Sequence, residues 1–156
     1  MRPGDVGVDA ACGVAYGAAL LCSHGDVTYY GVDKDLSGAL DLGQENVHLV
    51  EADLTTWVPS FEFDVLTGLE TNEHLADYSV YLNWARKARR FALFSVPIVP
   101  TVGANPFHLH DFQRDDLIEF FTDDDWHLFQ YFDQPSEVAG VYIFARNGIT
   151  PLTARG

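Results

Sequence analysis

The chain has 156 residues, 47% of them hydrophobic, and a formal net charge of −14 from 23 acidic and 9 basic residues. This length and apolar content suit one globular domain that buries its core without disulfides or a structural metal. The acidic charge disfavours polyanions such as nucleic acids as partners. The two cysteines are too few for a disulfide framework. Because no stretch resembles a signal peptide or a membrane span, we expect a cytoplasmic protein with no membrane contact.

One basic cluster, ARKARR at residues 85–90, departs from this charge balance. We interpret it as the solvated end of a helix, where the helix dipole favours cations. A nucleic-acid site is the rarer alternative for a single charge run.

Apolar runs of strand length alternate with stretches of helical period over the first hundred residues. The strands are expected at residues 6–10, 27–33, 47–53, 63–69 and 91–97. The helical patterns occupy residues 16–24, 35–43 and 77–90. This alternation predicts an α/β fold with a mostly parallel sheet, right-handed crossovers and helices on both faces.

The last third of the chain follows a different pattern. After a helical stretch at residues 114–122 come two strand-like segments, 126–134 and 138–147, separated by a short Pro/Ser turn. They predict an antiparallel hairpin at the sheet edge, which brings the sheet to seven strands. We therefore expect a single domain over residues 1–147 and a flexible tail over 148–156.

A turn of small residues follows the first expected strand, in VGVDAACGVAYGAALL at residues 6–21. Small side chains let the backbone approach a ligand, and the next helix offers free N–H groups. A tight turn without a ligand explains this stretch alone equally well. Two downstream acids favour a nucleotide: Asp33 can accept both hydrogen bonds of a ribose diol, and Asp53 can bind a purine edge whose face Leu54 covers.

Five motifs, in order, resemble the class I methyltransferases that use S-adenosylmethionine, and in particular their small-molecule branch: VGVDAACGVAYGAALL, YYGVDKD, NVHLVEADL, FDVLTGLETNEHL and NPFHLHDF. The resemblance covers residues 4–147. It implies a Rossmann-like fold, S-adenosylmethionine as the cofactor, and methyl transfer to a small-molecule or sugar-type acceptor, at oxygen.

The resemblance also implies which residues bind the cofactor. The turn would hold its methionine part, Asp33 its ribose and Asp53 its adenine. The implied set is Asp9, Ala11, Cys12, Gly13, Tyr16, Gly17, Asp33, Lys34, Asp53, Leu54, Leu69 and Glu70. The sequence departs from the family at Ala11 and Ala15, where glycine is usual.

Candidate catalytic residues follow from the chemistry. Methyl transfer from a sulfonium depends mainly on positioning, and a general base assists a hydroxyl acceptor. His74 and His108 are the first candidates for that base and Glu73 is the next, although a structural role at a helix start explains His74 equally well. His108, His110 and Asp111 have part of a metal-site spacing, but further ligands are not evident nearby, so no metal is expected.

Two other functional hypotheses stay open. The chain could be a methyltransferase-like cofactor-binding module without catalysis, acting as a subunit or regulator, which Ala15 and the few residues before the first strand favour. A nicotinamide-dependent oxidoreductase shares the turn and Asp33 but needs a GxGxxG spacing that is absent. The short N-terminal segment leaves three alternatives: an open acceptor site that takes a large acceptor, a second copy in a homo-oligomer or a partner subunit that supplies a lid over the acceptor, or a minimal enzyme.

Overall fold

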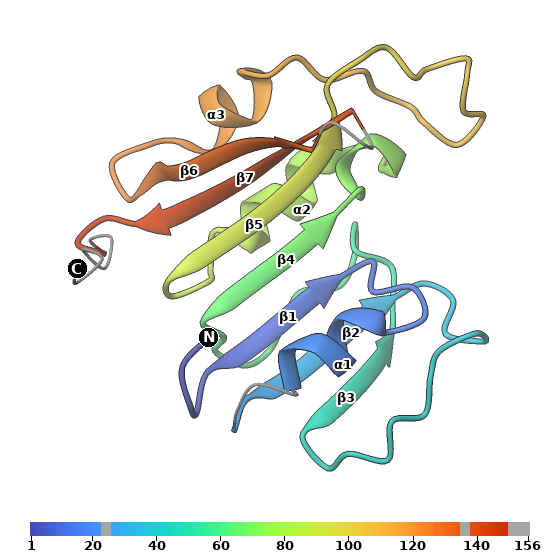
Figure 1. Cartoon of the computed structure of the whole chain (residues 1–156), viewed down its shortest axis with the longest axis vertical. Coiled ribbons are helices and arrows are strands. Elements are labelled where there is room, and N and C mark those ends of the chain that lie inside the picture. The colour runs from blue at the N-terminus through green and yellow to red at the C-terminus, as the bar shows by residue number, and fades with distance from the viewer. Residues whose placement is uncertain (23–25, 135–137, 150–156) are drawn as a thin grey trace.

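The strand-forming segments build one mixed β-sheet (Figure 1). The computed structural model describes residues 1–22, 26–134 and 138–149. The seven strands lie in the order β3-β2-β1-β4-β5-β7-β6. Their bounds are β1 Val6–Ala10, β2 Thr28–Asp33, β3 Val47–Glu51, β4 Val65–Leu69, β5 Phe91–Pro97, β6 Trp126–Gln134 and β7 Ala139–Arg146. The predicted seven-stranded, mostly parallel sheet is confirmed.

Strand direction explains where a ligand can enter. β1 to β5 pair in parallel, whereas β7 pairs antiparallel with both β5 and β6. β2 and β3 lie on one side of β1, and β4 and β5 lie on the other. The order of the strands therefore reverses at β1, and open α/β sheets bind ligands at the carboxyl edge beside such a point.

Helices cover both faces of the sheet, as predicted. They are α1 Tyr16–Cys22, α2 Tyr78–Ala85 and α3 Asp116–Phe121, with a short 3₁₀ helix η1 at Asn72–His74. α1 packs on the face to which Asp9 points, close to its carboxylate. Val8 and Ala10 point to the opposite face, because side chains alternate along a strand, and there they join a core with Tyr81 of α2. α3 lies on that second face too, since the Phe94 ring contacts both Tyr81 and a ring of α3.

The helix predicted over residues 35–43 is wrong. This segment contains only turns and irregular backbone. The Asp35 carboxylate accepts the N–H of Ser37 at 2.9 Å, and the Asp41 carboxylate accepts the N–H of Gly43 at 3.0 Å. Such local bonds compete with helical hydrogen bonds, and Gly43 has φ 57°, which no helix accommodates.

The remaining differences concern the ends of elements. α2 ends at Ala85 rather than at residue 90, and β3 ends at Glu51. Asp53 therefore lies in the loop two residues beyond the strand that was expected to end with it. Residues 23–24 of the first predicted helix, the predicted turn at 135–137 and residues 150–156 of the predicted tail lie outside the described residues.

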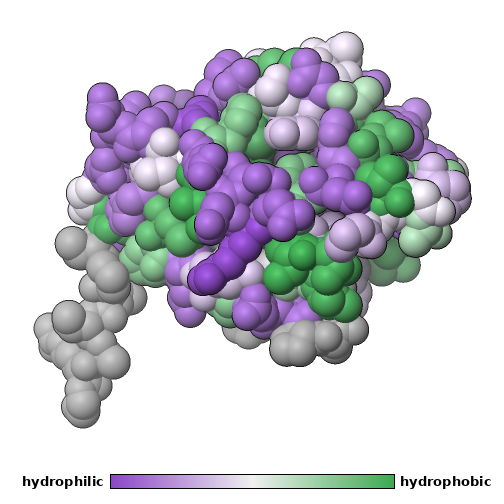
Figure 2. All heavy atoms as spheres, turned by 90° about the horizontal axis from the view of Figure 1, so that it is seen from above, coloured by the Kyte–Doolittle hydropathy of each residue, from purple (hydrophilic) through white to green (hydrophobic). Residues whose placement is uncertain are grey.

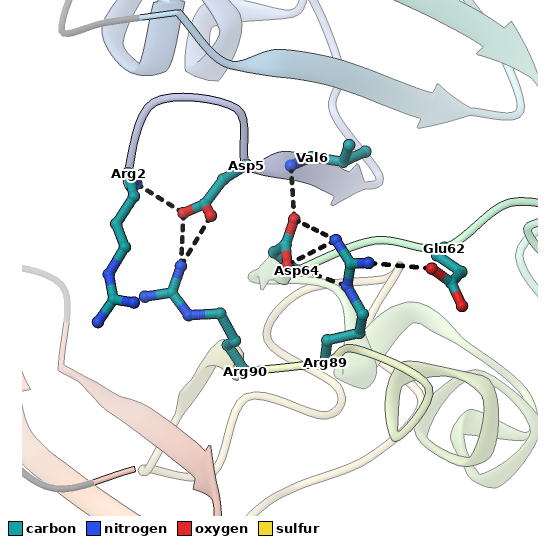
Figure 3. A network of polar contacts seen from close by, with 7 residues as sticks. All are labelled: Arg2, Asp5, Val6, Glu62, Asp64, Arg89 and Arg90. Atoms are coloured by element: carbon teal, nitrogen blue, oxygen red, sulfur yellow. Dashed lines mark hydrogen bonds and ion pairs between the residues drawn. The ribbon is translucent and has the colours of Figure 1, made fainter.

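The three arginines of the basic cluster at residues 85–90 form ion pairs with acids of the same chain, and Figure 3 shows those of Arg89 and Arg90. The Arg89 guanidinium donates from Nε and Nη2 to the Asp64 carboxylate at 3.0 and 2.9 Å. The Arg90 guanidinium donates to both oxygens of Asp5 at 2.8 and 2.7 Å. These arginines clamp the amino ends of β1 and β4 against β5, which is a different role from the solvated helix end that was expected.

The surface agrees with the acidic composition. The face shown in Figure 2 is largely hydrophilic, and its hydrophobic residues form separate patches. Within the described ranges, no helix is long and apolar enough to cross a membrane.

Candidate active site

A cavity of about 490 Å³ opens at the carboxyl edge of the sheet, beside the strand-order reversal at β1. Its walls come from the loops after β1, β2, β3, β4 and β5. Seven residues predicted from the sequence line it: Ala11, Asp33, Lys34, Asp53, Leu54, Glu70 and His74. The structure thus brings together acids that are up to 37 residues apart in the sequence, between Asp33 and Glu70.

The turn after β1 is built on left-handed backbone. Ala11, Gly13 and Ala15 have φ values of 57°, 53° and 62°. Glycine adopts this region freely, whereas an alanine there costs about 1–2 kcal/mol. The departures from the family at Ala11 and Ala15 therefore fall at positions where the backbone itself favours glycine.

Exchanging residues within this turn tests that strain. Ala11→Gly is expected to raise the free energy of unfolding by about 1 kcal/mol, because Ala11 is exposed and its methyl group contributes little packing. Gly13→Ala is the matched opposite change and is expected to lower it by about 1 kcal/mol, although an added Cβ meets no atom within 4 Å. Urea denaturation measures both. A destabilised Ala11→Gly variant would show that the methyl group packs more strongly than the strain costs.

The acid at the end of β2 is oriented by the backbone around it. The Gly13 N–H donates to Oδ2 of Asp33 at 2.8 Å, and the Asp35 N–H donates to Oδ1 at 3.1 Å. The carboxylate therefore holds the β1 turn next to the cavity. In the adjacent wall, Oδ1 of Asp53 accepts the Thr55 hydroxyl at 2.6 Å and the Thr55 N–H at 2.8 Å. These bonds hold the pKa of Asp53 below its usual value, so this carboxyl stays ionised.

The Asp9 side chain is hydrogen-bonded to the two strands that flank β1. Its carboxylate accepts the Tyr29 hydroxyl at 2.6 Å and the Thr67 hydroxyl at 2.7 Å, and it does not line the cavity. Burial raises its pKa. A Cβ on Gly17 would lie 2.8 Å from Oδ2 of Asp9, so this glycine lets α1 approach the strand. Asp9 thus links β1 to its two neighbouring strands, β2 and β4, beneath the start of α1.

Five further residues of the implied cofactor set lie away from the cavity wall: Cys12, Gly13, Tyr16, Gly17 and Leu69. Cys12 is buried, whereas Tyr16 and Leu69 are exposed. Six further residues line the cavity that were not predicted, among them Thr71 and Phe107. Both lie inside motifs that were singled out for their neighbours, so the signal was present in ETNEHL and NPFHLHDF.

The segment after β4 carries a strained residue. Glu70 has φ 50°, and its N–H donates to the Ser95 carbonyl oxygen at 3.1 Å. The Ser95 hydroxyl donates in turn to Oε1 of Glu70 at 2.6 Å. Strained backbone of this kind persists only where the surroundings hold it, and it concentrates at functional sites. β5 thus fixes the Glu70 carboxylate in the cavity wall.

The three catalytic candidates meet at one end of the cavity. The rings of His74 and His108 lie nearly perpendicular, with centroids 4.7 Å apart. Nε2 of His74 lies 3.8 Å from Oε1 of Glu73. Glu73 is fully buried, and this burial is the main cause that raises its pKa to about 7, with the charge of Glu70 acting in the same direction.

The histidine of the second HxH position lies elsewhere. Nε2 of His110 lies 2.8 Å from the Leu75 carbonyl oxygen, and its ring contacts Tyr78. The Asp111 carboxylate instead accepts the N–H groups of Thr101 and of the next residue, at 2.6 and 2.9 Å. His108, His110 and Asp111 are therefore not arranged around a common point.

The strand order and the position of the cavity define the class I S-adenosylmethionine-dependent methyltransferase fold, and solved structures with this fold resemble the chain closely. No protein-family profile matches the sequence, and no curated protein matches it either.

Three solved structures illustrate the likeness. An S-adenosylmethionine-dependent methyltransferase from Mesorhizobium loti has a TM-score of 0.78 at 13% identity, covering 92% of each chain. A complex of the Trm112 methyltransferase activator with a methyltransferase, from Haloferax volcanii, contains a chain with TM-score 0.78 and 13% identity, covering 93% of this chain and 84% of that one. The 1,6-didemethyltoxoflavin-N1-methyltransferase of Burkholderia thailandensis, with bound 1,6-didemethyltoxoflavin and S-adenosylhomocysteine, has TM-score 0.69 and 16% identity, covering 92% of this chain and 71% of that one. At such identities the likeness concerns the fold.

Proposed function

We propose that the protein is an S-adenosylmethionine-dependent methyltransferase that methylates a small-molecule or sugar-type acceptor at oxygen. The observation that carries the proposal is the cavity at the carboxyl edge, which has ordered acids along one wall and the Glu73, His74 and His108 group at one end. The bound S-adenosylhomocysteine in the Burkholderia neighbour supports the choice of cofactor.

The cofactor would lie along the wall formed by the loops after β1, β2 and β3. Asp33 would accept the ribose hydroxyls, and Asp53 would accept the adenine amino group. Lys34 would flank the ribose, and the backbone N–H of Leu54 would donate to the purine. The turn at Ala11 would face the methionine part, whereas Asp9 would act indirectly, by holding β1 to β2 and β4.

The reaction needs the acceptor oxygen to attack the methyl carbon while the carbon–sulfur bond breaks and its electron pair returns to sulfur. The acceptor proton must go to a base. Nδ1 of His74 lies 3.1 Å from the Phe107 carbonyl oxygen, so in the neutral ring Nδ1–H donates and Nε2 carries the lone pair. His74 lines the cavity and so would meet the acceptor, with Glu73 and His108 behind it.

Calorimetric titration with S-adenosylhomocysteine tests the cofactor assignment. Asp33→Ala is expected to weaken binding by about 1.5–3 kcal/mol, or roughly 10–150-fold, because a charged hydrogen-bond acceptor is lost. Asp35→Ala is the matched control, since this neighbouring acid is exposed and does not line the cavity. Equal affinities of the Asp33→Ala variant and the wild type would remove Asp33 from the site. Binding without turnover across an acceptor screen would support the cofactor-binding module instead.

The compartment and the partners are also part of the proposal. Both cysteines are free, which fits a reducing cytoplasm. The Haloferax neighbour is a methyltransferase complexed with an activator, which supports a partner subunit over the acceptor end of the cavity. A second copy of this chain is the alternative occupant.

A further inference from the structure

The buried carboxylate and the two histidines at the end of the cavity come from two different segments. Glu73 and His74 belong to η1, and His108 lies in the loop after β5. One ligand atom of each lies within 4.8 Å of the others. The Leu109 N–H donates to the Glu73 carbonyl oxygen at 2.7 Å and so ties the two segments together. We propose that Glu73, His74 and His108 bind a divalent transition-metal cation.

Glu73 provides the first argument, because its side chain has no hydrogen-bond partner. It is 0% exposed, and neither Oε1 nor Oε2 is hydrogen-bonded within the part of the chain that the structure describes. Burying a polar group without a partner costs free energy, and native proteins leave few such groups. Oε1 lies 3.8 Å from Nε2 of His74, so a nitrogen ligand is close to the carboxylate. A cation bound between them would supply the missing partner.

The orientation of the imidazoles provides the second argument. Nδ1 of His74 lies 3.1 Å from the Phe107 carbonyl oxygen, and Nδ1 of His108 lies 2.7 Å from Oγ1 of Thr101. The Phe107 carbonyl oxygen can only accept, so Nδ1–H of His74 donates to it and Nε2 keeps its lone pair. The Thr101 hydroxyl can accept from Nδ1–H of His108 in the same way, which leaves Nε2 of that ring for a metal. Histidines that bind metals are held in this way by an acceptor behind the ring.

Thr101 is itself fixed in place. The Asp111 carboxylate accepts its N–H at 2.6 Å and lies 3.5 Å from its hydroxyl. The hydroxyl can therefore donate to Asp111 while its oxygen accepts from His108. This relay gives Asp111, which is not one of the three ligands, a positioning role behind His108.

The ligand types indicate the kind of metal. Two imidazoles and one carboxylate suit Zn²⁺, Fe²⁺ or Co²⁺, whereas Mg²⁺ and Ca²⁺ prefer oxygen ligands. Binding needs the ligand atoms to approach one another more closely than 4.8 Å. Glu73 is buried in the core, so the exposed His74 ring would shift toward it while Nδ1 keeps its contact with the Phe107 carbonyl oxygen.

Three protein ligands leave coordination positions open, as in catalytic metal sites. His74 lines the cavity, so these positions face it. The role of the cation in catalysis rests on the proposed function: in a methyltransferase, the cation would bind the acceptor oxygen and favour its deprotonated state. The group would then act as one metal centre rather than as three separate candidate bases.

Cobalt titration tests the site. Chelator-treated protein is titrated with Co²⁺ and followed by visible absorption, with Zn²⁺ calorimetry as the second readout. We expect one equivalent to bind, and we expect His74→Ala and His108→Ala each to weaken binding at least tenfold. His110→Ala is the matched control from the same loop, because its ring contacts the Leu75 carbonyl instead, and it should bind like the wild type. Thr101→Val should weaken binding about 10–100-fold through the orientation of His108.

The outcomes distinguish the metal site from the proposed methyltransferase function. Absence of Co²⁺ binding, or binding that is unchanged in both His74→Ala and His108→Ala, overturns the metal site. Glu73→Gln checks the carboxylate without removing volume, and circular dichroism confirms that each variant is folded. S-adenosylhomocysteine titration of the metal-free protein reports on the cofactor wall alone. Binding of S-adenosylhomocysteine without binding of Co²⁺ would refute only the metal site. Binding of Co²⁺ without binding of S-adenosylhomocysteine would refute only the proposed methyltransferase function.

Discussion

Gly68→Ala is expected to lower the free energy of unfolding by about 3 kcal/mol, at the upper end of the cost of overpacking a core. Gly68 lies in β4, at the centre of the sheet, one residue before the exposed end of the strand. A Cβ there would lie 1.7 Å from the Tyr81 hydroxyl oxygen and 2.9 Å from the adjacent ring carbon. Tyr81 is 0% exposed and packs against the rings of Trp84 and Phe94, so it cannot move aside. Urea denaturation measures the loss.

Tyr81→Phe should rescue part of this loss. The Tyr81 hydroxyl is buried and has no hydrogen-bond partner within the described ranges, so its removal alone should raise stability by about 1 kcal/mol. The double variant should be more stable than the sum of the single changes predicts, because the two groups are in contact. Gly38→Ala is the control, since its Cβ would meet only Val14, at 3.8 Å. A double variant no more stable than Gly68→Ala would place the strain elsewhere.

The effect of this packing reaches the site. Gly68 allows α2 to pack closely under β4, and the strand then continues through Leu69 to the strained Glu70 in the cavity wall. The loop after β4 and the η1 helix with Glu73 follow directly. The position of the buried carboxylate therefore depends on a glycine that no functional pattern in the sequence singled out.

Local pattern was enough to predict much of the fold. β1, β5 and β6 begin and end where they were expected. β1 and β5 lie within the sheet, and such buried strands read as continuous apolar segments. β6 is the edge strand, and there the aromatic residues of WHLFQYFDQ indicated the strand. The predicted helix at residues 35–43 failed because Asp35 and Asp41 bond to nearby backbone, and helical spacing does not reveal that competition. The order of the strands was accessible only through the resemblance of the motifs.

The site was predictable where a residue acts through its position at the sheet edge. Asp33 and Asp53 meet at the cavity because parallel strands end at the same edge. Asp9 also ends a strand in the sequence, yet its carboxylate accepts hydrogen bonds from Tyr29 and from Thr67, which is 58 residues away. Partners so distant in sequence leave no local signal. Thr101, which orients His108, lies only seven residues from it, but no sequence motif links the two residues.

Asp64→Ala is expected to lower the free energy of unfolding by about 3 kcal/mol at pH 7. Asp64 is 6% exposed, and its carboxylate accepts the N–H of Val6, at the start of β1, at 2.9 Å (Figure 3). It also accepts two hydrogen bonds from the Arg89 guanidinium, at 3.0 and 2.9 Å. Its loss leaves the part-buried Val6 N–H without its acceptor and leaves Arg89 paired only with the exposed Glu62, which together cost up to about 3 kcal/mol. Asp124→Ala, an exposed acid, is the control and should change stability little.

The pH dependence of this contribution follows from the pKa of Asp64. Burial opposes ionisation, but the Arg89 hydrogen bonds, the Val6 N–H and the two arginine charges outweigh it, so the pKa lies below its usual value. A carboxyl group with a lowered folded-state pKa stabilises fully above its unfolded pKa of about 3.9, and this stability is lost as the pH falls through the folded pKa. The difference between wild type and Asp64→Asn in urea denaturation should therefore be constant from pH 7 to about pH 5 and shrink below about pH 4. A difference that stayed constant down to pH 2 would mean that the carboxylate charge contributes nothing, and that the Arg89 clamp stabilises the sheet through its shape and packing alone.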